Sequence, residues 1–415
     1  MTLVTLIYLY MKKITIYILL LLVGISVFAE QNEIIQQKTF PKIVEEETNN
    51  YTDTNRQKDD KTENEFYKSE SKFRQPDFVQ GIYLTAYKVA SKEFDVILAE
   101  AAAAGINTVV FDLKNMNGEV FFKTAQNQFL TSENQKPIID IKSVTKRLHE
   151  RNMRAVSRVV MFHDIYNAKR DSTLRATNAD STAWMESKKR GPAWLDPSNP
   201  QVQNYLFDLI NEIAKSGVDE IQMDYVRFPT QGTANEAIFY FQKEDEERVR
   251  KDSLYVNRER KQIIKEFVKN VKKICDKHDV TLSADVFAIV AWQRNADIKS
   301  TGQDMELLTE NLNNIHPMIY SSHFADNFGY RKNVPNEPYL LMYQGTKYTM
   351  NSTIENCNVV PYIQANAWKV NYKKDYLEAQ IRAIKDVKAK GFILWNASNK
   401  YKETLTWLTE MKKPD

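Results

Sequence analysis

Short runs of apolar, β-branched and aromatic residues alternate along residues 77–415 with longer segments that carry apolar side chains on one helical face. Runs of this length and composition are typical of buried strands, whereas apolar positions three and four residues apart indicate amphipathic helices. The pattern predicts eight strands: 81–87, 108–114, 154–162, 220–226, 281–288, 315–322, 359–365 and 391–397.

Amphipathic helices are predicted between these strands. The clearest are 92–105, 202–217, 261–278 and 376–391, and several end in a glycine shortly before the next strand, a common helix stop. Strands that alternate with helices form parallel βα units, and eight such units predict an α/β fold of the (β/α)8 TIM-barrel type. An open doubly wound sheet is the alternative. A nucleotide-binding sheet of that kind would carry a glycine-rich loop after its first strand, and the segment YLTAYKVAS lacks one.

The first 76 residues differ in character from the rest of the chain. Lys12 and Lys13 precede an apolar run at 14–28, and Ala29 occupies the last position before a plausible cleavage site. This layout predicts a secretory signal peptide over 1–29, with Met11 as a possible alternative start. Residues 30–76 are polar and charged without hydrophobic periodicity, so we expect a disordered linker there.

These segments predict an exported protein, periplasmic or secreted, with a single folded domain over 77–415. An uncleaved signal that holds the protein at the membrane is the alternative. The apolar run is shorter than the roughly 20 residues that a membrane span needs, so we expect cleavage and no stable membrane span.

Composition narrows the possible partners and cofactors. The net charge is +3 and basic and acidic residues are intermixed, so nucleic-acid binding is not indicated. Cys275 and Cys357 could form a disulfide in an exported protein, but their spacing does not decide whether they meet. The sequence has no HxH or HExxH pattern, and we therefore expect neither a metal site nor a cofactor.

Acidic residues stand at the ends of two neighbouring predicted strands. In the stretch DEIQMDYVRFP, Asp224 ends the fourth strand, and Asp285 ends the fifth. The strand ends of a closed barrel form the mouth where active sites lie, and hydrolysis of a glycosidic bond uses two such carboxylates. We therefore expect Asp224 and Asp285 to be the catalytic pair. A structural ion pair, for example between Asp224 and Arg227, is the alternative.

Further polar and aromatic residues at the strand ends are predicted to bind a sugar, because amides and acids bind hydroxyl groups and aromatic rings stack on flat C–H faces. These predicted substrate-binding residues are Asp112, Arg158, Asp164, Trp194, Tyr225, Arg227, Tyr320, Gln364, Trp395 and Asn396. Asp112 could instead pair with Lys114 or Arg158. The longest loop on this face, 230–258, is expected to form a lid or a substrate wall.

The stretch at 219–229 resembles the fourth-strand signature of a bacterial family of glycoside hydrolases with a TIM barrel. The segments GIYLTAY, NTVVFDLKNMNGEVFF, RVVMFHD and SADVFA are similar to other parts of that family, and the resemblance covers roughly residues 77–400. Met223 stands where the signature usually has phenylalanine, which is a tolerable exchange in a core.

The resemblance implies hydrolysis of glycosidic bonds and a distant similarity to α-amylase-like barrels. In those barrels a nucleophilic aspartate ends strand four and the proton donor ends strand five. Transferred to this chain, the resemblance makes Asp224 the nucleophile and Asp285 the acid/base, although those barrels have glutamate at the second position. The expected substrate is a polysaccharide or oligosaccharide. The alternative is a non-catalytic polysaccharide-binding or cell-envelope protein on a degenerate barrel.

Overall fold

A ring of parallel strands forms the centre of the molecule, seen here in a computed structural model that describes residues 73–412 except 126 and 331. The strands pair in the order β10-β11-β1-β2-β5-β6-β7-β8-β9. Their bounds are β1 (Val79–Leu84), β2 (Thr108–Lys114), β5 (Arg154–Val160), β6 (Glu220–Asp224), β7 (Thr281–Val286), β8 (Asn314–Pro317), β9 (Asn358–Val359), β10 (Tyr362–Gln364) and β11 (Gly391–Trp395).

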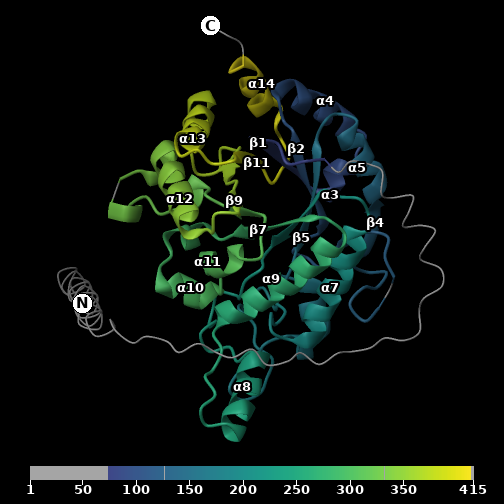
Figure 1. Cartoon of the computed structure of the whole chain (residues 1–415), viewed down its shortest axis with the longest axis vertical. Coiled ribbons are helices and arrows are strands. Elements are labelled where there is room, and N and C mark those ends of the chain that lie inside the picture. Colours follow the sequence, from purple (N-terminus) through teal and green to yellow (C-terminus); the bar gives the residue numbers. More distant parts are fainter. Residues whose placement is uncertain (1–72, 126, 331, 413–415) are drawn as a thin grey trace, which may run out of the picture. The chain divides into compact units, whose positions relative to one another are not determined.

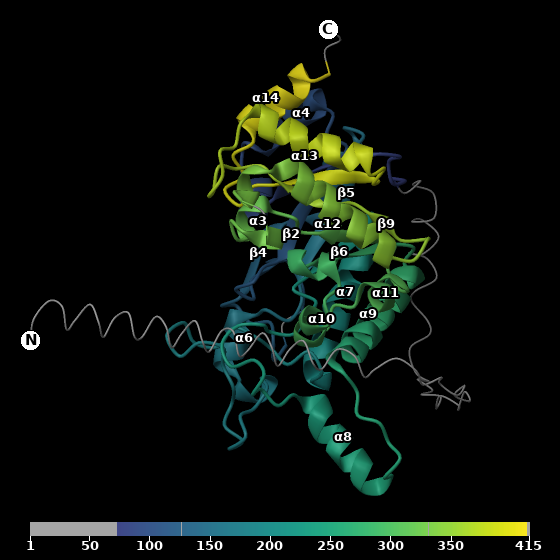
Figure 2. The same cartoon turned by 90° about the vertical axis from the view of Figure 1, so that its left-hand side faces the viewer.

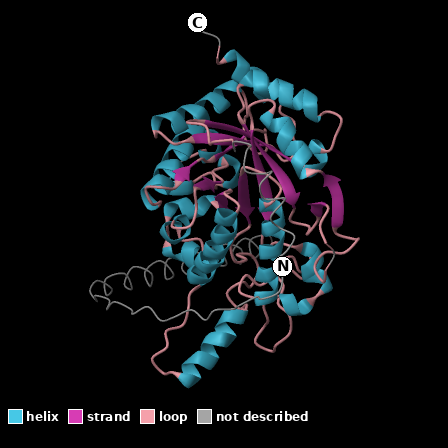
Figure 3. Cartoon of the chain, turned by 45° about the vertical axis from the view of Figure 1, so that its right-hand side comes forward, coloured by secondary structure: helices cyan, strands magenta, loops and turns pink. Residues whose placement is uncertain are grey.

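The seventh barrel strand is split into β9 and β10, separated by Val360 and Pro361. A proline cannot donate a hydrogen bond to a neighbouring strand, which accounts for the interruption. Because β9 pairs with β8 and β10 pairs with β11, and a parallel bridge joins Met318 to Tyr362, the sheet closes on itself. The predicted (β/α)8 fold is confirmed, and Figure 3 shows the strands enclosed by helices.

Helices surround the strands and follow them in sequence (Figure 1). Their bounds are α3 (Ala86–Val89), α4 (Phe94–Ala104), α5 (Ile141–His149), α6 (Ile165–Arg170), α7 (Pro200–Ala214), α8 (Tyr240–Lys251), α9 (Arg260–Lys277), α10 (Asn295–Thr301), α11 (Met305–Thr309), α12 (Pro338–Ser352), α13 (Lys374–Asp386) and α14 (Lys402–Glu410). The four helices predicted with most clarity are α4, α7, α9 and α13. Gly105 caps α4 with a φ of 81°, a left-handed conformation that suits glycine.

Two excursions leave the regular βα pattern. After β2 the chain forms β3 (Val120–Phe122), which pairs with the end of β2, and β4 (Gln135–Ile139), which pairs with β3. The sequence did not predict these two strands. The long loop after β6 contains α8. Figure 2 shows that α8 extends away from the barrel, so it does not form a lid in this structure.

Alternation along β6 explains the sequence pattern that ends in Asp224. Successive side chains of a strand point to opposite faces of the sheet. Ile221 and Met223 belong to the apolar core that the helices cover. Glu220 and Gln222 bind groups on other strands inside the barrel: Glu220 accepts from Asn314 at 3.0 Å, and Gln222 donates to Tyr362 Oη at 2.6 Å. Asp224 therefore faces the barrel interior as well.

The described chain begins slightly before the predicted domain boundary at residue 77. Phe73 stacks on His149 with ring centroids 4.6 Å apart, and its carbonyl accepts a hydrogen bond from Arg154 at 3.1 Å. Phe73, which belongs to the predicted linker, thus contacts the barrel. The predicted signal peptide and residues 30–72 of the linker lie outside the described residues.

Cys275 and Cys357 are both buried and are not joined by a disulfide.

Among residues 73–412, no helix combines the length and the apolar character that crossing a bilayer requires.

Candidate active site

Arg158 on β5 lies at the centre of the site. Its Nη1 donates to Oδ1 of Asp112 at 2.5 Å, and its Nε and Nη2 donate to Oδ2 of Asp224 at 3.1 Å and 2.5 Å. Strand register explains these contacts, since Asp112 pairs with Arg158 across β2 and β5 and Asp224 stands beside Val160, two residues further along β5. Burial alone would lower the pKa of Arg158, but the two carboxylates raise it well above its usual value, so the guanidinium stays charged.

Asp224 is held in place by a strained turn. Its Oδ1 accepts a hydrogen bond from the backbone N–H of Tyr225 at 2.6 Å. Tyr225 has a φ of 52°, in the left-handed region that large side chains seldom adopt. Such backbone strain gathers at functional sites. Here the turn ends β6 and leaves Asp224 on the wall of a cavity.

Asp285 on β7 faces the same interior but is more enclosed than Asp224. Its Oδ1 accepts from Nε2 of Gln222 at 2.6 Å, its side chain is 1% exposed, and it does not line the cavity. Nε of Arg158 lies 3.1 Å from Oδ2 of Asp224 and 3.9 Å from Oδ2 of Asp285, so these two carboxylate oxygens are at most about 7 Å apart. Burial raises the pKa of Asp285 well above its usual value, and the charge of Asp224 raises it further. Asp285 is thereby favoured as a protonated acid.

Asp112 on β2 is the third carboxyl group of the cluster. Its Oδ2 accepts from the hydroxyl of Tyr83 at 2.6 Å, and its side chain lines the cavity. Burial raises the pKa of Asp112, although Arg158 and the Tyr83 hydroxyl oppose this shift. Two of the three acids around Arg158 therefore have a raised pKa, and only one of these two reaches the cavity wall.

The cavity has a volume of about 680 Å³ and opens at the carboxyl ends of the strands. Aromatic rings form much of one wall: Tyr83 stacks on Trp395 at 4.2 Å, and Tyr320 lies 5.9 Å from the same indole. The predicted site residues that line it are Asp112, Arg158, Asp224, Tyr225, Arg227, Tyr320 and Trp395. A cavity of this size with flat rings and charged groups suits a saccharide.

Arg227 stands on the cavity wall between aromatic rings. The centre of its guanidinium lies 4.7 Å from the Trp194 ring centroid and 5.1 Å from that of Phe287. Its Nη1 donates to the Phe228 carbonyl at 2.9 Å, and among the described residues it forms no ion pair. The alternative pairing of Asp224 with Arg227 is therefore not what the structure shows, because Asp224 binds Arg158 instead. Trp194 itself is buried and supports Arg227 without lining the cavity.

The sequence of the barrel matches a known protein family. Residues 81–401 match a family described as "Putative glycosyl hydrolase domain". The chain belongs to this glycosyl hydrolase family. The match spans all eight barrel strands except the first two residues of β1, and so it includes every predicted site residue. A search of curated proteins found no match.

Two solved structures are similar to this member of the glycosyl hydrolase family. The PgaB (BpsB) glycoside hydrolase domain from Bordetella bronchiseptica aligns with a TM-score of 0.58 and 10% identity, covering 81% of this chain and 100% of that one. A hypothetical protein from Ruminiclostridium thermocellum aligns with a TM-score of 0.40 and 26% identity, covering 49% of this chain and 97% of that one. The first of these shows a shared barrel architecture.

Asp164, predicted to bind substrate, lies away from the cavity in this glycosyl hydrolase barrel. Its side chain is fully buried, as is that of Lys114, and the two form an ion pair of 3.1 Å. Asp164 also caps α6 by accepting a hydrogen bond from the backbone N–H of Asn167 at 2.9 Å. All its described contacts are therefore with the protein, and they tie the β2 and β5 ends together.

Gln364 and Asn396 line a side hollow next to the cavity rather than the cavity itself. Their amide groups hold loops: Gln364 Nε2 donates to the carbonyl of Trp368 at 3.0 Å, and Asn396 Nδ2 donates to the carbonyl of Ala365 at 2.8 Å. Both residues are thus at the mouth, as predicted, and both shape the loop that follows β10.

Some residues of the site carried no clear signal in the sequence. Tyr83 and Gln222 bind Asp112 and Asp285 directly, yet each lies within an apolar strand. The polar positions of EIQMD, spaced two apart, could have singled out Gln222. His163 lies 5.0 Å from the Tyr225 ring, and its Nδ1 donates to the Met116 carbonyl at 3.0 Å, so it packs the turn after β6.

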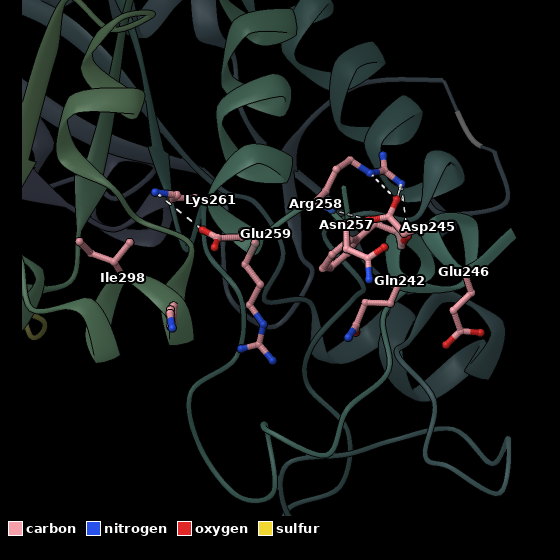
Figure 4. A pocket seen from close by; sticks show the side chains of 11 residues that line it. Gln242, Asp245, Glu246, Asn257, Arg258, Glu259, Lys261 and Ile298 are labelled. Carbon is pink, nitrogen blue, oxygen red and sulfur yellow. Dashed lines mark hydrogen bonds and ion pairs between the residues drawn. The ribbon is translucent and has the colours of Figure 1, made fainter. Parts of the chain in front are cut away.

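A second depression of about 390 Å³ lies between α8 and α9, away from these residues (Figure 4). Arg258 pairs with acidic side chains here, since its Nε donates to Asp245 Oδ1 at 2.7 Å and its Nη2 donates to Glu244 Oε2 at 2.8 Å. Among residues 73–412, no group of three or more His, Cys, Asp or Glu side chains is placed to hold a metal ion.

Proposed function

We propose that the protein is an exported glycosidase that cleaves a polysaccharide, with Asp224 as the nucleophile and Asp285 as the acid/base. One observation carries this proposal: Asp224 lies on the wall of a saccharide-sized cavity, and the same arginine that binds it also approaches Asp285. The family to which the chain belongs supports the reaction class. The predicted signal peptide supports export.

The separation of the carboxyl groups fits this chemistry. Retaining glycosidases hold their two carboxyl groups about 5–5.5 Å apart and inverting enzymes about 6.5–9.5 Å apart. The bound of about 7 Å between the Asp224 and Asp285 oxygens is compatible with retention and with the short end of inversion. It excludes the wider inverting arrangements for these two oxygens.

The protonation states divide the two roles. A general acid must carry its proton at the working pH, and the raised pKa of Asp285 meets this condition. Asp224 accepts three hydrogen bonds, two from Arg158 and one from the backbone N–H of Tyr225, which fix its position on the cavity wall. Two carboxyl groups in different environments thus supply an acid and a nucleophile.

Asp112 competes with Asp285 for the role of acid. It also has a raised pKa, and it reaches the cavity wall, whereas Asp285 lies behind that wall. If Asp285 is the acid, Gln222 or Arg158 must move slightly so that the proton of Asp285 can reach the glycosidic oxygen. The two assignments make opposite predictions for Asp285→Asn and Asp112→Asn.

Substrate binding is assigned to the rings and polar groups of the cavity. Tyr83 and Trp395 offer a stacked aromatic surface, and Arg227 presents its remaining donors to a sugar hydroxyl or an acidic substituent. Tyr225 and Tyr320 complete the wall. Trp194 acts through its neighbour Arg227, whereas Asp164 pairs with the buried Lys114 and is not assigned a substrate contact.

A polysaccharide-binding protein without activity is the second candidate. It is favoured by one observation, namely that both oxygens of Asp224 are already engaged by Arg158 and the Tyr225 N–H. Incubation of the wild-type protein with a panel of neutral, amino-sugar and uronic-acid polysaccharides, followed by product analysis, separates the two. Release of shorter chains establishes the glycosidase, and retention on one polysaccharide without any cleavage establishes the binding protein.

Export is tested separately from activity. Sequencing the N-terminus of the protein from its native host should give a mature chain that begins at Glu30. A native chain that keeps residues 12–29 would show that the signal is not cleaved.

A further inference from the structure

Trp368, in the loop after β10, is a large aromatic side chain held in an exposed position. It is 52% exposed although it contacts both His323, with ring centroids 5.2 Å apart, and the Lys369 ammonium, 4.4 Å from its ring centroid. Exposing a tryptophan forfeits the favourable burial of its apolar surface. A single exposed apolar residue needs no explanation by itself, so a binding role for Trp368 must be judged from the residues around it.

The backbone of this loop is fixed rather than free. Gln364 Nε2 donates to the carbonyls of Asn366 and Trp368 at 3.1 Å and 3.0 Å, and the Trp368 N–H donates to Oδ1 of Asn366 at 3.0 Å. Gln364 is itself buried and accepts from the Ser322 N–H at 3.2 Å. The indole is therefore presented from an anchored loop, which lowers the entropy lost when a ligand binds.

The indole borders a side hollow of about 530 Å³, which we call the Trp368 hollow. Amide and hydroxyl side chains form much of its lining: Gln364, Asn366, Asn396, Ser322 and Ser398. It shares Tyr320, His323, Trp395 and Ala397 with the cavity that contains Asp224, so the two spaces adjoin along these residues.

The hollow lies on a different side of the barrel mouth from Asp224. Trp368 follows β10, and Asp224 ends β6, three strand positions away by way of β7 and β8. At 4.7–4.9 Å for each strand spacing, this corresponds to roughly 14 Å along the barrel wall. One sugar unit bound at Asp224 does not reach that far, whereas a chain of several units does.

We propose that the Trp368 hollow is a binding subsite for a saccharide unit remote from the point of cleavage, in which the free face of the indole stacks on the sugar ring. The proposal rests on the proposed glycosidase function and specifies its substrate as a polymer. Because the subsite adjoins the cavity rather than closing it, cleavage is expected inside the chain rather than only at its end.

The test compares Trp368→Ala with Leu254→Ala as a control variant. Leu254 is 86% exposed and does not line the cavity or the hollow. Affinity electrophoresis of each protein in gels that contain β-glucan, xylan, chitosan or polygalacturonate gives its retardation. The size of the products from the same polysaccharides is followed over time. Each variant is also made in the Asp224→Asn background, so that binding is measured without cleavage.

We expect Trp368→Ala to bind at least about ten-fold more weakly to the polysaccharide that retards the wild type, because the variant loses the aromatic surface that a bound sugar would cover. Leu254→Ala should bind like the wild type. Loss of retardation in Trp368→Ala when the wild type binds without cleaving would uphold the Trp368 hollow as a saccharide-binding site and overturn the glycosidase. Equal retardation of both variants would overturn the subsite and leave the glycosidase standing. Absence of retardation of the wild type in every gel would also overturn the subsite.

Discussion

Arg158 donates to Asp224 through two nitrogens, Nε at 3.1 Å and Nη2 at 2.5 Å, inside the mouth of the barrel. The same guanidinium binds Asp112, so one buried cation holds two carboxylates from the strands on either side of its own. Removal of one member of such a cluster leaves uncompensated buried charge. The cluster therefore contributes to the stability of the barrel as well as to its chemistry.

The stability contribution can be measured with Arg158→Met. We expect the free energy of unfolding to fall by about 3–5 kcal/mol, because Asp112 and Asp224 lose their buried counter-charge. Urea denaturation followed by circular dichroism gives this value. Arg151→Met is the matched control, since Arg151 pairs with the exposed Asp95 and such pairs contribute at most about 1 kcal/mol. An equal fall in the free energy of unfolding of the two variants would show that the Arg158 cluster stabilises the barrel no more than an exposed ion pair does.

The pH dependence of stability reports on Asp285. A carboxyl group whose pKa is raised by folding keeps its proton in the folded state after the unfolded chain has lost it, so stability falls as pH rises above the unfolded value near 3.8. We expect this decline to be smaller in Asp285→Asn, which has no proton to lose at this position. Urea midpoints at pH values from 4 upward test this. Parallel profiles for the two proteins would show that Asp285 does not have a raised pKa.

The pH dependence of turnover separates the two candidate acids. If Asp285 is the general acid, Asp285→Asn lowers kcat about 10²–10⁴-fold and removes the alkaline limb of the kcat profile, while Asp112→Asn keeps that limb. The measurement is the initial rate of reducing-end release over the pH range in which each variant stays folded. The reverse pattern would transfer the role of acid to Asp112.

Arg227 provides a prediction about substrate affinity. Arg227→Met keeps the side chain's volume between Trp194 and Phe287 but removes its hydrogen-bond donors from the cavity. We expect KM to rise about ten-fold, the loss of one charge-assisted hydrogen bond, with a smaller change in kcat. An unchanged KM would mean that Arg227 serves only to pack the two rings.

Much of the fold could be predicted from the sequence because buried parallel strands correspond to apolar runs of five to seven residues. The runs at 108–114 and 220–226 match β2 and β6 closely. The strand β3 was missed because three residues are too few to show a period, and β4 was missed because most of its five residues are not buried. The seventh strand was predicted as one strand because its apolar run is continuous in the sequence. Pro361 divides it in the structure because proline has no N–H to donate to a neighbouring strand.

The candidate site was predicted in part. Strand ends identify which residues reach the mouth, and this placed Asp112, Asp224 and Trp395 on the cavity. Partner choice depends on register, and so the binding of Asp224 to Arg158 rather than Arg227 could not be deduced from spacing. The enclosure of Asp285 behind Gln222 depends on side-chain packing across three strands, for which a single sequence has no signal.

The most direct test of the catalytic role of Asp224 is the rate of glycosidic bond cleavage by Asp224→Asn on the polysaccharide that the wild type degrades. The asparagine keeps the shape of the side chain and an oxygen for Arg158, so the variant should fold and bind substrate. We predict that its turnover falls more than about 10⁴-fold, as expected for a nucleophile. A variant that is folded and still turns over substrate at the wild-type rate would contradict the assignment of Asp224.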